Sequence, residues 1–237
     1  MPLRRLSQAV DAALGLRPGM IALMGDYIAD HLVARPPMHE DVAAELARLQ
    51  APCGVVAVTG NHDWYQDRQA QERGYGPVAI ARTLAQAGID VLENEARRLN
   101  MSSGQPIWLA GLSSQQITRH RGMYPAHGIS GADDLDGTLM AVTDNAPVIL
   151  LAHEPNIINR VPQRVSLTVS GHTHGGQINL PILRKIAARH LGTPHLWGHH
   201  VVKGRDLIVS GGMGCSGLPI RMGRKPELTM IEIGRYE

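Results

Sequence analysis

The chain has 237 residues, of which 43% are hydrophobic and 19% are charged, a composition typical of folded globular proteins rather than disordered ones. Lys and Arg number 23 and Asp and Glu number 21, so the net charge of +2 gives no indication of a nucleic-acid-binding protein. No apolar run approaches the ~18 residues that read as a membrane-spanning helix. Phe is absent and His occurs 12 times, which matters because His is the commonest metal ligand.

Short apolar runs alternate with helical patterns along the chain. Apolar residues at helical spacing in the first segment predict an amphipathic helix rather than a secretory signal: Leu3, Leu6, Val10 and Leu14. Two further helices are predicted, at residues 41–50 with Asp41 as N-cap, and at residues 78–87. Strands are predicted at residues 20–24, 55–58, 107–110, 148–151 and 165–169. The last part predicts a hairpin over residues 201–209 with a four-residue turn, and a closing strand at residues 228–233.

The arrangement of these elements predicts the fold class. Strands of four or five apolar residues without alternation indicate sheets that are covered on both faces. Helices between several of the strands favour a layered α/β fold. No internal repeat, linker or low-complexity tract divides the chain, so we expect a single α/β domain over residues 1–237.

Four polar clusters each follow a predicted strand directly. They are Gly25-Asp26, the GNHD of residues 60–63, His153-Glu154, and the GHTHGG of residues 171–176. Ligands of open α/β sheets gather at the carboxyl ends of strands, so the four clusters indicate one site. Asp, Asn and His side chains suit divalent ions such as Mn, Fe or Zn. The two cysteines, Cys53 and Cys215, lack metal-site spacing and are expected to be reduced thiols.

The order of these motifs resembles that of the calcineurin-like metallophosphoesterases. Four longer segments are similar to a bacterial phosphodiesterase branch of that family: LENE (92–95), LAHEP (151–155), SGHTHGGQ (170–177) and LPIRMGRKPE (218–227). The resemblance covers nearly the whole chain from residue 22 onward. It implies a layered β-sandwich flanked by helices, in the order αββα, and metal-dependent hydrolysis of a phosphoester.

The resemblance also implies metal ligands. Asp26 would bridge two divalent ions, Asn61, His153 and His172 would complete the second metal site, and His174 would serve the first. Two metals ~3.5–4 Å apart can clamp and polarise a phosphoryl group, and a hydroxide held between them is a nucleophile at neutral pH.

Two further residues would have catalytic roles. The resemblance implies that His62 contacts the phosphate and protonates the leaving oxygen, which solves the problem of a poor alkoxide leaving group. Asp63 would orient His62.

The sequence departs from the family pattern at its beginning. The family starts with a strand and an Asp-x-His motif that supply two ligands of the first metal. Here the only acid upstream of Asp26 is Asp11, and no His occurs there, so the first site keeps only Asp26 and His174. We expect that the sequence as given lacks the family's first strand. The alternative is a chain that binds one metal, or an inactive relative that serves as a binding or scaffold protein.

The expected substrate is a small phosphodiester or pyrophosphate, including nucleotide-linked ones, and no nucleic-acid partner is expected. The expected location is the cytoplasm, with contact to a membrane surface as a further expectation. Basic residues that could meet lipid head groups or an anionic substrate are Arg184, Lys185, Arg221, Arg224 and Lys225.

Overall fold

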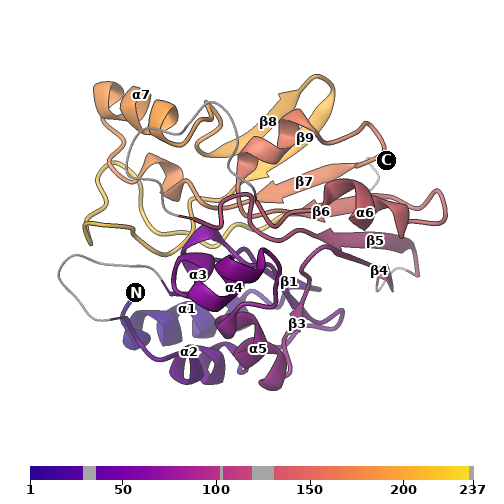
Figure 1. Ribbon diagram of the computed structural model, residues 1–237, viewed down its shortest axis with the longest axis horizontal. Coiled ribbons are helices and arrows are strands. Elements are labelled where there is room, and N and C mark those ends of the chain that lie inside the picture. The colour runs from indigo at the N-terminus through magenta and orange to yellow at the C-terminus, as the bar shows by residue number, and fades with distance from the viewer. Residues whose placement is uncertain (29–35, 102–103, 119–130, 235–237) are drawn as a thin grey trace.

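The computed structural model describes residues 1–28, 36–101, 104–118 and 131–234 (Figure 1). The helices of this part are α1 (Leu3–Gly15), α2 (His39–Leu46), α3 (Asn61–Tyr65), α4 (Arg68–Arg73), α5 (Ala79–Gln86), α6 (Leu135–Met140) and α7 (Pro181–His190). Two short 3-10 helices are η1 (Pro155–Asn159) and η2 (His174–Gly176). None of these helices has the length and apolar character that crossing a membrane requires.

The strands form two sheets. The smaller sheet is parallel and has the order β1 (Ile21–Leu23), β2 (Val55–Ala57), β3 (Asp90–Val91). The larger sheet has the order β4 (Glu95–Asn100), β5 (Pro106–Gly111), β6 (Val148–Leu151), β7 (Leu167–Ser170), β9 (Arg205–Val209), β8 (Gly198–Val202). Its four inner strands are parallel, and β4 and β8 pair with them in antiparallel fashion at the two edges.

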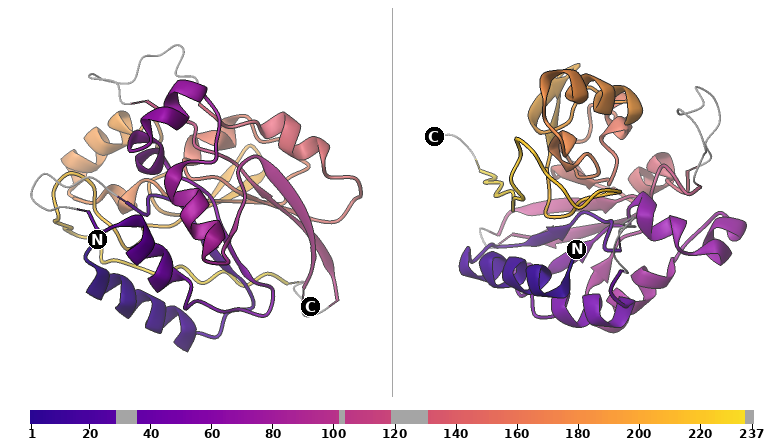
Figure 2. Two further views of the ribbon diagram at one scale, coloured as in Figure 1. Left: turned by 60° about the horizontal axis from the view of Figure 1, so that its bottom comes forward. Right: turned by 90° about the vertical axis from the view of Figure 1, so that its left-hand side faces the viewer.

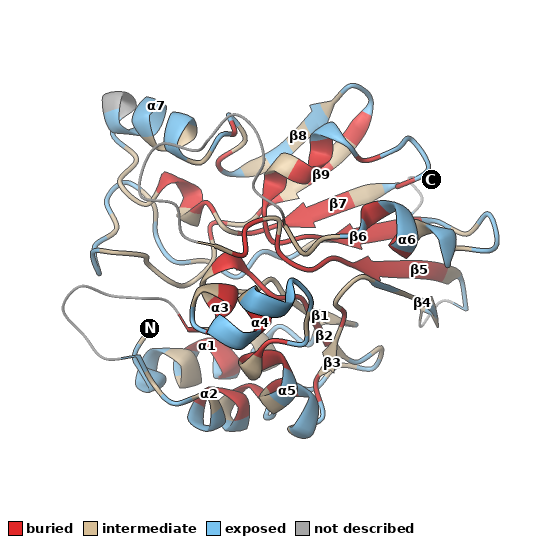
Figure 3. Cartoon of the chain, in the orientation of Figure 1, coloured by how far each residue is buried: buried red, intermediate tan, exposed pale blue. Residues whose placement is uncertain are grey.

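Apolar side chains fill three layers, which confirms the predicted sandwich flanked by helices. The middle layer lies between the two sheets, where Val58 and Leu92 share a cluster with Leu109, Leu151 and Val169. A second layer joins the small sheet to α1, α2 and α5, and a third joins the large sheet to α6 and η1. Figure 2 shows the stacked sheets from two more directions, and Figure 3 shows buried residues concentrated in the strands and on the inner faces of the helices.

Three local predictions were wrong. Helix α2 begins at His39 with Met38 as N-cap; Asp41 lies in the first helical turn, where a carboxylate is also favourable next to the helix dipole. The hairpin turn has two residues, Lys203 and Gly204, whose φ values of 50° and 76° suit a tight turn between twisted strands. Residues 228–233 form no strand.

Strand β4 was not predicted, because it has few apolar side chains. Its sequence EARRLN forms an edge of the large sheet and has no fully buried residue. An edge strand that is half solvated needs neither a continuous apolar run nor strict alternation. The apolar strands of the interior, in contrast, lie where their sequences predict them.

Candidate metal centre

Loops from both sheets bring the polar clusters together. Asp26 follows β1, Asn61 opens α3 after β2, His153 follows β6, and His172 follows β7. The ring Nδ1 of His153 lies 2.5 Å from the carbonyl oxygen of Met24, a contact that joins the large sheet to the small one. Asp26 and His172 have φ values of 60° and 67°. Such left-handed backbone is unusual for residues other than Gly and is typical of functional turns.

Three side chains form a group that could hold a cation. One ligand atom from each of Asp26, His153 and His172 lies within 4.8 Å of the others. Asp26 Oδ2 lies 3.1 Å from His153 Nε2, and the rings of His153 and His172 meet edge to face with 5.1 Å between their centres. Because Nδ1 of His153 faces a carbonyl oxygen, Nε2 is the ring nitrogen that would bind a metal once it has lost its proton.

Buried polar atoms around this group lack protein partners. Among the described residues, Asn61 Oδ1 and both ring nitrogens of His172 are buried without a hydrogen bond. Buried polar groups are almost always satisfied, so each exception needs a physical reason. A divalent cation would take a lone pair from Asn61 Oδ1 and from one ring nitrogen of His172. Carboxylate, amide and imidazole donors suit Mn, Fe or Zn. The residues present therefore fit a metal ion.

Asp26 and His153 form a buried charged pair at this site. Burial raises the pKa of Asp26, but the neighbouring His153 outweighs burial and holds that pKa well below its usual range. Burial lowers the pKa of His153, but Asp26 outweighs it and raises the pKa to about 10. Burial, with His153 as a further cause, lowers the pKa of His172 to about 3. At pH 7 the site thus holds an anionic Asp26 beside a protonated His153 and a neutral His172, and a cation that binds there would take the place of the His153 proton.

Glycine is required beside these ligands. A Cβ atom added at Gly60 would lie 2.7 Å from the ring of His153, and would also meet Asp26. A Cβ at Gly25 would lie 2.5 Å from the backbone nitrogen of Gly60. Both positions need a residue without a side chain so that the strand ends can approach closely.

His174 lies on the same loop as His172 but outside the group of three. Its φ is 52°, and its Nδ1 lies 2.9 Å from Gln177 Oε1, which leaves Nε2 as the ligand atom. Burial is the main cause that lowers the pKa of His174, so its ring is neutral at pH 7.

The hydrogen bonds that the structure gives the Asp63 carboxylate come from backbone N–H groups, and none of them involves the ring of His62. Its carboxylate accepts from the backbone nitrogens of Asp26 (2.9 Å), Tyr27 (2.9 Å) and Gly60 (2.8 Å). Burial, with Asp26 as a further cause, raises its pKa to about 7, although two of these N–H donors lower it. Asp63 therefore fastens the loops after β1 and β2 to each other.

His62 stands at the edge of the cluster. Its backbone nitrogen donates to Asp26 Oδ1 at 2.9 Å, and its ring Nε2 lies 3.0 Å from Ser216 Oγ. The backbone contact fixes the start of α3 against the candidate ligand Asp26.

Sequence reasoning missed two residues that build this site, Gln177 and Ser216, and named Arg221 as a basic residue that could meet an anionic substrate. Gln177 joins His174 to the loop of residues 211–217, Arg221 donates to the carbonyl oxygens of Gly211 and Gly214 in that loop, and Ser216 reaches His62. Gln177 and Arg221 lie in motifs that the sequence analysis singled out, so a signal existed for them. Ser216 lies in a short Gly-rich stretch whose composition indicates a loop and no particular contact.

A protein-family model and several known proteins match this chain. A family model described as calcineurin-like phosphoesterase matches residues 2–176. The uncharacterized metallophosphoesterase YkuE of Bacillus subtilis is 30% identical over 92% of this chain and 68% of its own length. The phosphodiesterase YaeI of Escherichia coli is 26% identical over 98% of this chain and 77% of its own length.

Two further comparisons concern length and fold. A transmembrane protein with metallophosphoesterase domain from Danio rerio is 30% identical over 96% of this chain, which spans only 48% of that relative. The crystal structure of TT1561 from Thermus thermophilus superposes with a TM-score of 0.50 at 15% identity, over 88% of this chain and 84% of that one. At that identity the likeness is one of fold alone.

Proposed function

This chain belongs to the calcineurin-like phosphoesterase family, and on that premise we propose that it hydrolyses a small phosphodiester or pyrophosphate at the candidate metal centre. Phosphoester hydrolysis with divalent metal ions is the general chemistry of this family. The observation that carries the proposal is the group formed by Asp26, His153 and His172, whose ligand atoms lie within 4.8 Å of one another. Nucleotide-linked diesters are included in the proposed substrate class.

Four residues would hold one cation, namely Asp26, Asn61, His153 and His172. A second cation would be held by His174 Nε2 together with Asp26. A bound divalent ion supplies Lewis-acid polarisation of the phosphoryl group and lowers the pKa of a water molecule. Mn, Fe and Zn are the proposed ions, because all of these donors are oxygen and nitrogen atoms.

The protein's own contribution to the reaction would come from His62 and Asp63. His62 is proposed to protonate the leaving oxygen, because its ring is near enough to act on the pKa values of Asp26 and His172 and its backbone N–H donates to Asp26 Oδ1. Asp63 is proposed as a positioning residue that holds the backbone of Asp26 and Gly60 in place. Neither role requires either residue to touch the metal.

The test is hydrolysis of bis(p-nitrophenyl) phosphate by the whole chain with added Mn²⁺. We expect chelation to abolish turnover and Mn²⁺ to restore it, and we expect Asn61→Ala and His172→Ala to lower kcat/KM by about 100-fold or more. His199→Ala is the matched control, because His199 is exposed on β8 and pairs with Asp206. Undiminished activity in both ligand variants would contradict the assignment. Tight Mn²⁺ binding without turnover of any diester would favour a binding or scaffold protein.

We also propose that one exposed surface contacts an anionic membrane. The α7 surface consists of six exposed apolar side chains on α7, at its N-cap and on the neighbouring segment of residues 218–222, namely Leu180, Leu183, Ile186, Leu218, Ile220 and Met222. The two segments are adjacent, because Asn179 donates its backbone N–H to the carbonyl oxygen of Met222 at 2.8 Å. Exposed apolar residues gathered on neighbouring segments are typical of interaction sites.

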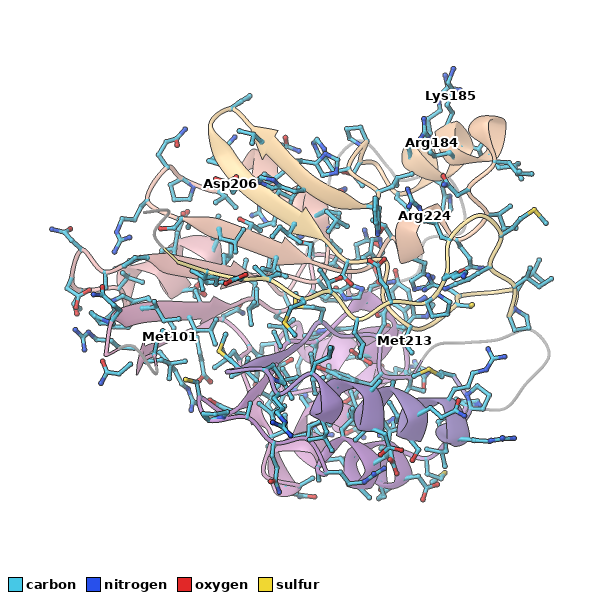
Figure 4. All side chains as sticks on the ribbon, turned by 180° about the vertical axis from the view of Figure 1, so that it is seen from behind. Met101, Arg184, Lys185, Asp206, Met213 and Arg224 are labelled. Atoms are coloured by element: carbon cyan, nitrogen blue, oxygen red, sulfur yellow. The ribbon has the colours of Figure 1, made fainter. Side chains whose placement is uncertain are left out.

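Charge favours a lipid surface as the partner. Residues 177–226 contain eight Lys or Arg and a single acid, Asp206. Figure 4 shows Arg184 and Lys185 on α7, with Lys185 pointing away from the molecule, whereas Asp206 lies far from both on the hairpin. Basic side chains beside exposed Leu and Ile on a helix are typical of helices that lie in a membrane interface.

A further inference from the structure

Ser216 reaches the ring of His62 from a distant part of the chain. Its Oγ lies 3.0 Å from His62 Nε2, although 154 residues separate the two in sequence. The other ring nitrogen of His62, Nδ1, is buried. Ser216 Oγ stands next to Nε2, so a proton that leaves the ring from Nε2 can pass to this hydroxyl.

The loop that bears Ser216 is held in place at several points. Gln177 accepts from the backbone nitrogen of Ser216 at 2.9 Å and donates to the carbonyl oxygens of Ser216 (3.1 Å) and Leu218 (3.0 Å). The same Gln177 oxygen faces His174 Nδ1 at 2.9 Å. Arg221 donates to the carbonyl oxygens of Gly211 and Gly214 earlier in the loop. The position of the Ser216 hydroxyl is thus tied to the loop that carries the candidate ligands.

A serine hydroxyl can accept one hydrogen bond and donate another at the same time. We propose that Ser216 is a catalytic residue that relays a proton from His62 Nε2 to the oxygen of the leaving group. The Oγ–H bond breaks as its proton passes to the leaving oxygen, and Oγ takes the Nε2 proton in the same step. The serine is regenerated, the imidazolium becomes neutral, and the leaving group departs as an alcohol. This inference rests on the proposed phosphoester hydrolysis.

A relay predicts a dependence that a merely structural serine would not show. Leaving groups that are already stable as anions need no proton, whereas weakly acidic alcohols and phenols need one. Removing the relay should therefore slow only the hydrolysis of esters with poor leaving groups. A loop that had simply lost its shape would slow all esters alike.

The experiment measures kcat/KM of the Mn²⁺-loaded protein for methyl aryl phosphate diesters, from dinitrophenyl to unsubstituted phenyl. We expect Ser216→Ala to lower the rate for the phenyl ester by about 10- to 100-fold and to leave the dinitrophenyl ester within about twofold. Ser216→Thr, which keeps a hydroxyl, should restore most of the phenyl rate. His62→Ala should show the same selective loss, and the double variant should lose no more than the worse single one, because both act on one step.

Ser210→Ala is the matched control. Ser210 lies just before the loop and bonds Thr229 and the backbone of Gly212, so its removal should leave the leaving-group dependence unchanged. If Ser216→Ala does not fold, Ser216→Gly carries the same expectation. An equal loss for all esters, or no loss for any, would overturn the relay while leaving the proposed hydrolysis intact. Absence of turnover in the unaltered protein with every ester would overturn both.

Discussion

Asp63 fastens the backbone of two loops that carry the candidate ligands. Its Oδ2 accepts from both Asp26 and Gly60, so an amide at this position would turn a donor towards N–H groups. We expect Asp63→Asn to weaken Mn²⁺ binding by about 10- to 100-fold, in line with outer residues of other metal sites. We also expect it to lower the free energy of unfolding by about 1–3 kcal/mol. Calorimetric titration with Mn²⁺ and urea unfolding measure the two effects.

Asp67, a second buried carboxylate, is the control that separates an effect on stability from an effect on metal binding. Asp67 caps α4 and accepts from the backbone nitrogens of Ala70 and Ala79, but it makes no bond to the loops of the metal centre in the part of the chain that the structure describes. Asp67→Asn should lower stability and keep the Mn²⁺ affinity. Equal affinities in Asp63→Asn and the unaltered protein would show that Asp63 does not position the site.

Single residues differ in how far their surroundings could be predicted. Asp26, Asn61, His153 and His172 each follow an apolar strand, so their gathering at one edge could be predicted from the sequence. The contacts of Asp63 could not, since a carboxylate beside a His gives no indication of which backbone N–H groups it will meet. Nor could the approach of Ser216 to His62, because it depends on how residues 211–217 cross the molecule.

Asp144 ties the loop before β6 to two strands. Its carboxylate accepts from the backbone of Ala146 at 2.9 Å, from Trp108 Nε1 at 2.8 Å on β5, and from Arg98 Nε at 2.9 Å on β4. These three donors, with Ala146 first, lower the pKa of Asp144 to about 2. A depressed carboxyl pKa contributes stability above the unfolded pKa of about 3.9, and that contribution is lost as the pH falls towards 2.

We therefore expect Asp144→Asn to be less stable than the unaltered protein at pH 7, with a difference that shrinks between about pH 4 and pH 2. Urea unfolding at several pH values measures this. The difference should be largest near neutrality, where the carboxylate is fully charged, and Asp136→Asn on α6 is the control. A difference that stays constant across the acid range would show that charge on Asp144 does not stabilise the strands.

Whole elements were predictable where burial dictates the sequence. The interior strands β5 and β6 are apolar because helices cover one of their faces and another sheet covers the other. Elements with little burial, such as β4 and the short α4, lack such a pattern and were not predicted. The hairpin lies where the sequence predicts it, but its turn is shorter than predicted. A two-residue turn requires positive φ at Lys203 and Gly204, and a long side chain such as that of Lys203 does not indicate this conformation.

At the scale of the whole molecule, helix α7 stands apart from the cores. None of its described side chains is buried, and Leu183 and Ile186 are 40% and 54% exposed. Helices α1, α2 and α5, in contrast, contribute buried side chains to the layer behind the small sheet (Figure 3). An apolar helix face that the fold leaves uncovered, with basic neighbours, calls for a partner outside the chain.

If that partner is an anionic bilayer, the protein should sediment with vesicles that contain phosphatidylglycerol and remain in solution with vesicles of phosphatidylcholine alone. Each basic residue near such a surface contributes about 1 kcal/mol, so Arg184→Glu with Lys185→Glu should weaken binding by about tenfold or more, and added salt should act in the same direction. Leu183→Ser with Ile186→Ser should also release the protein, because less apolar surface would enter the interface. Met140→Ser, which removes an 84% exposed side chain on α6, is the control and should bind normally. Failure to sediment with either kind of vesicle would contradict membrane contact. If the protein instead forms a dimer in solution, and the Leu183 and Ile186 substitutions dissociate that dimer, then a second copy of this chain covers the α7 surface.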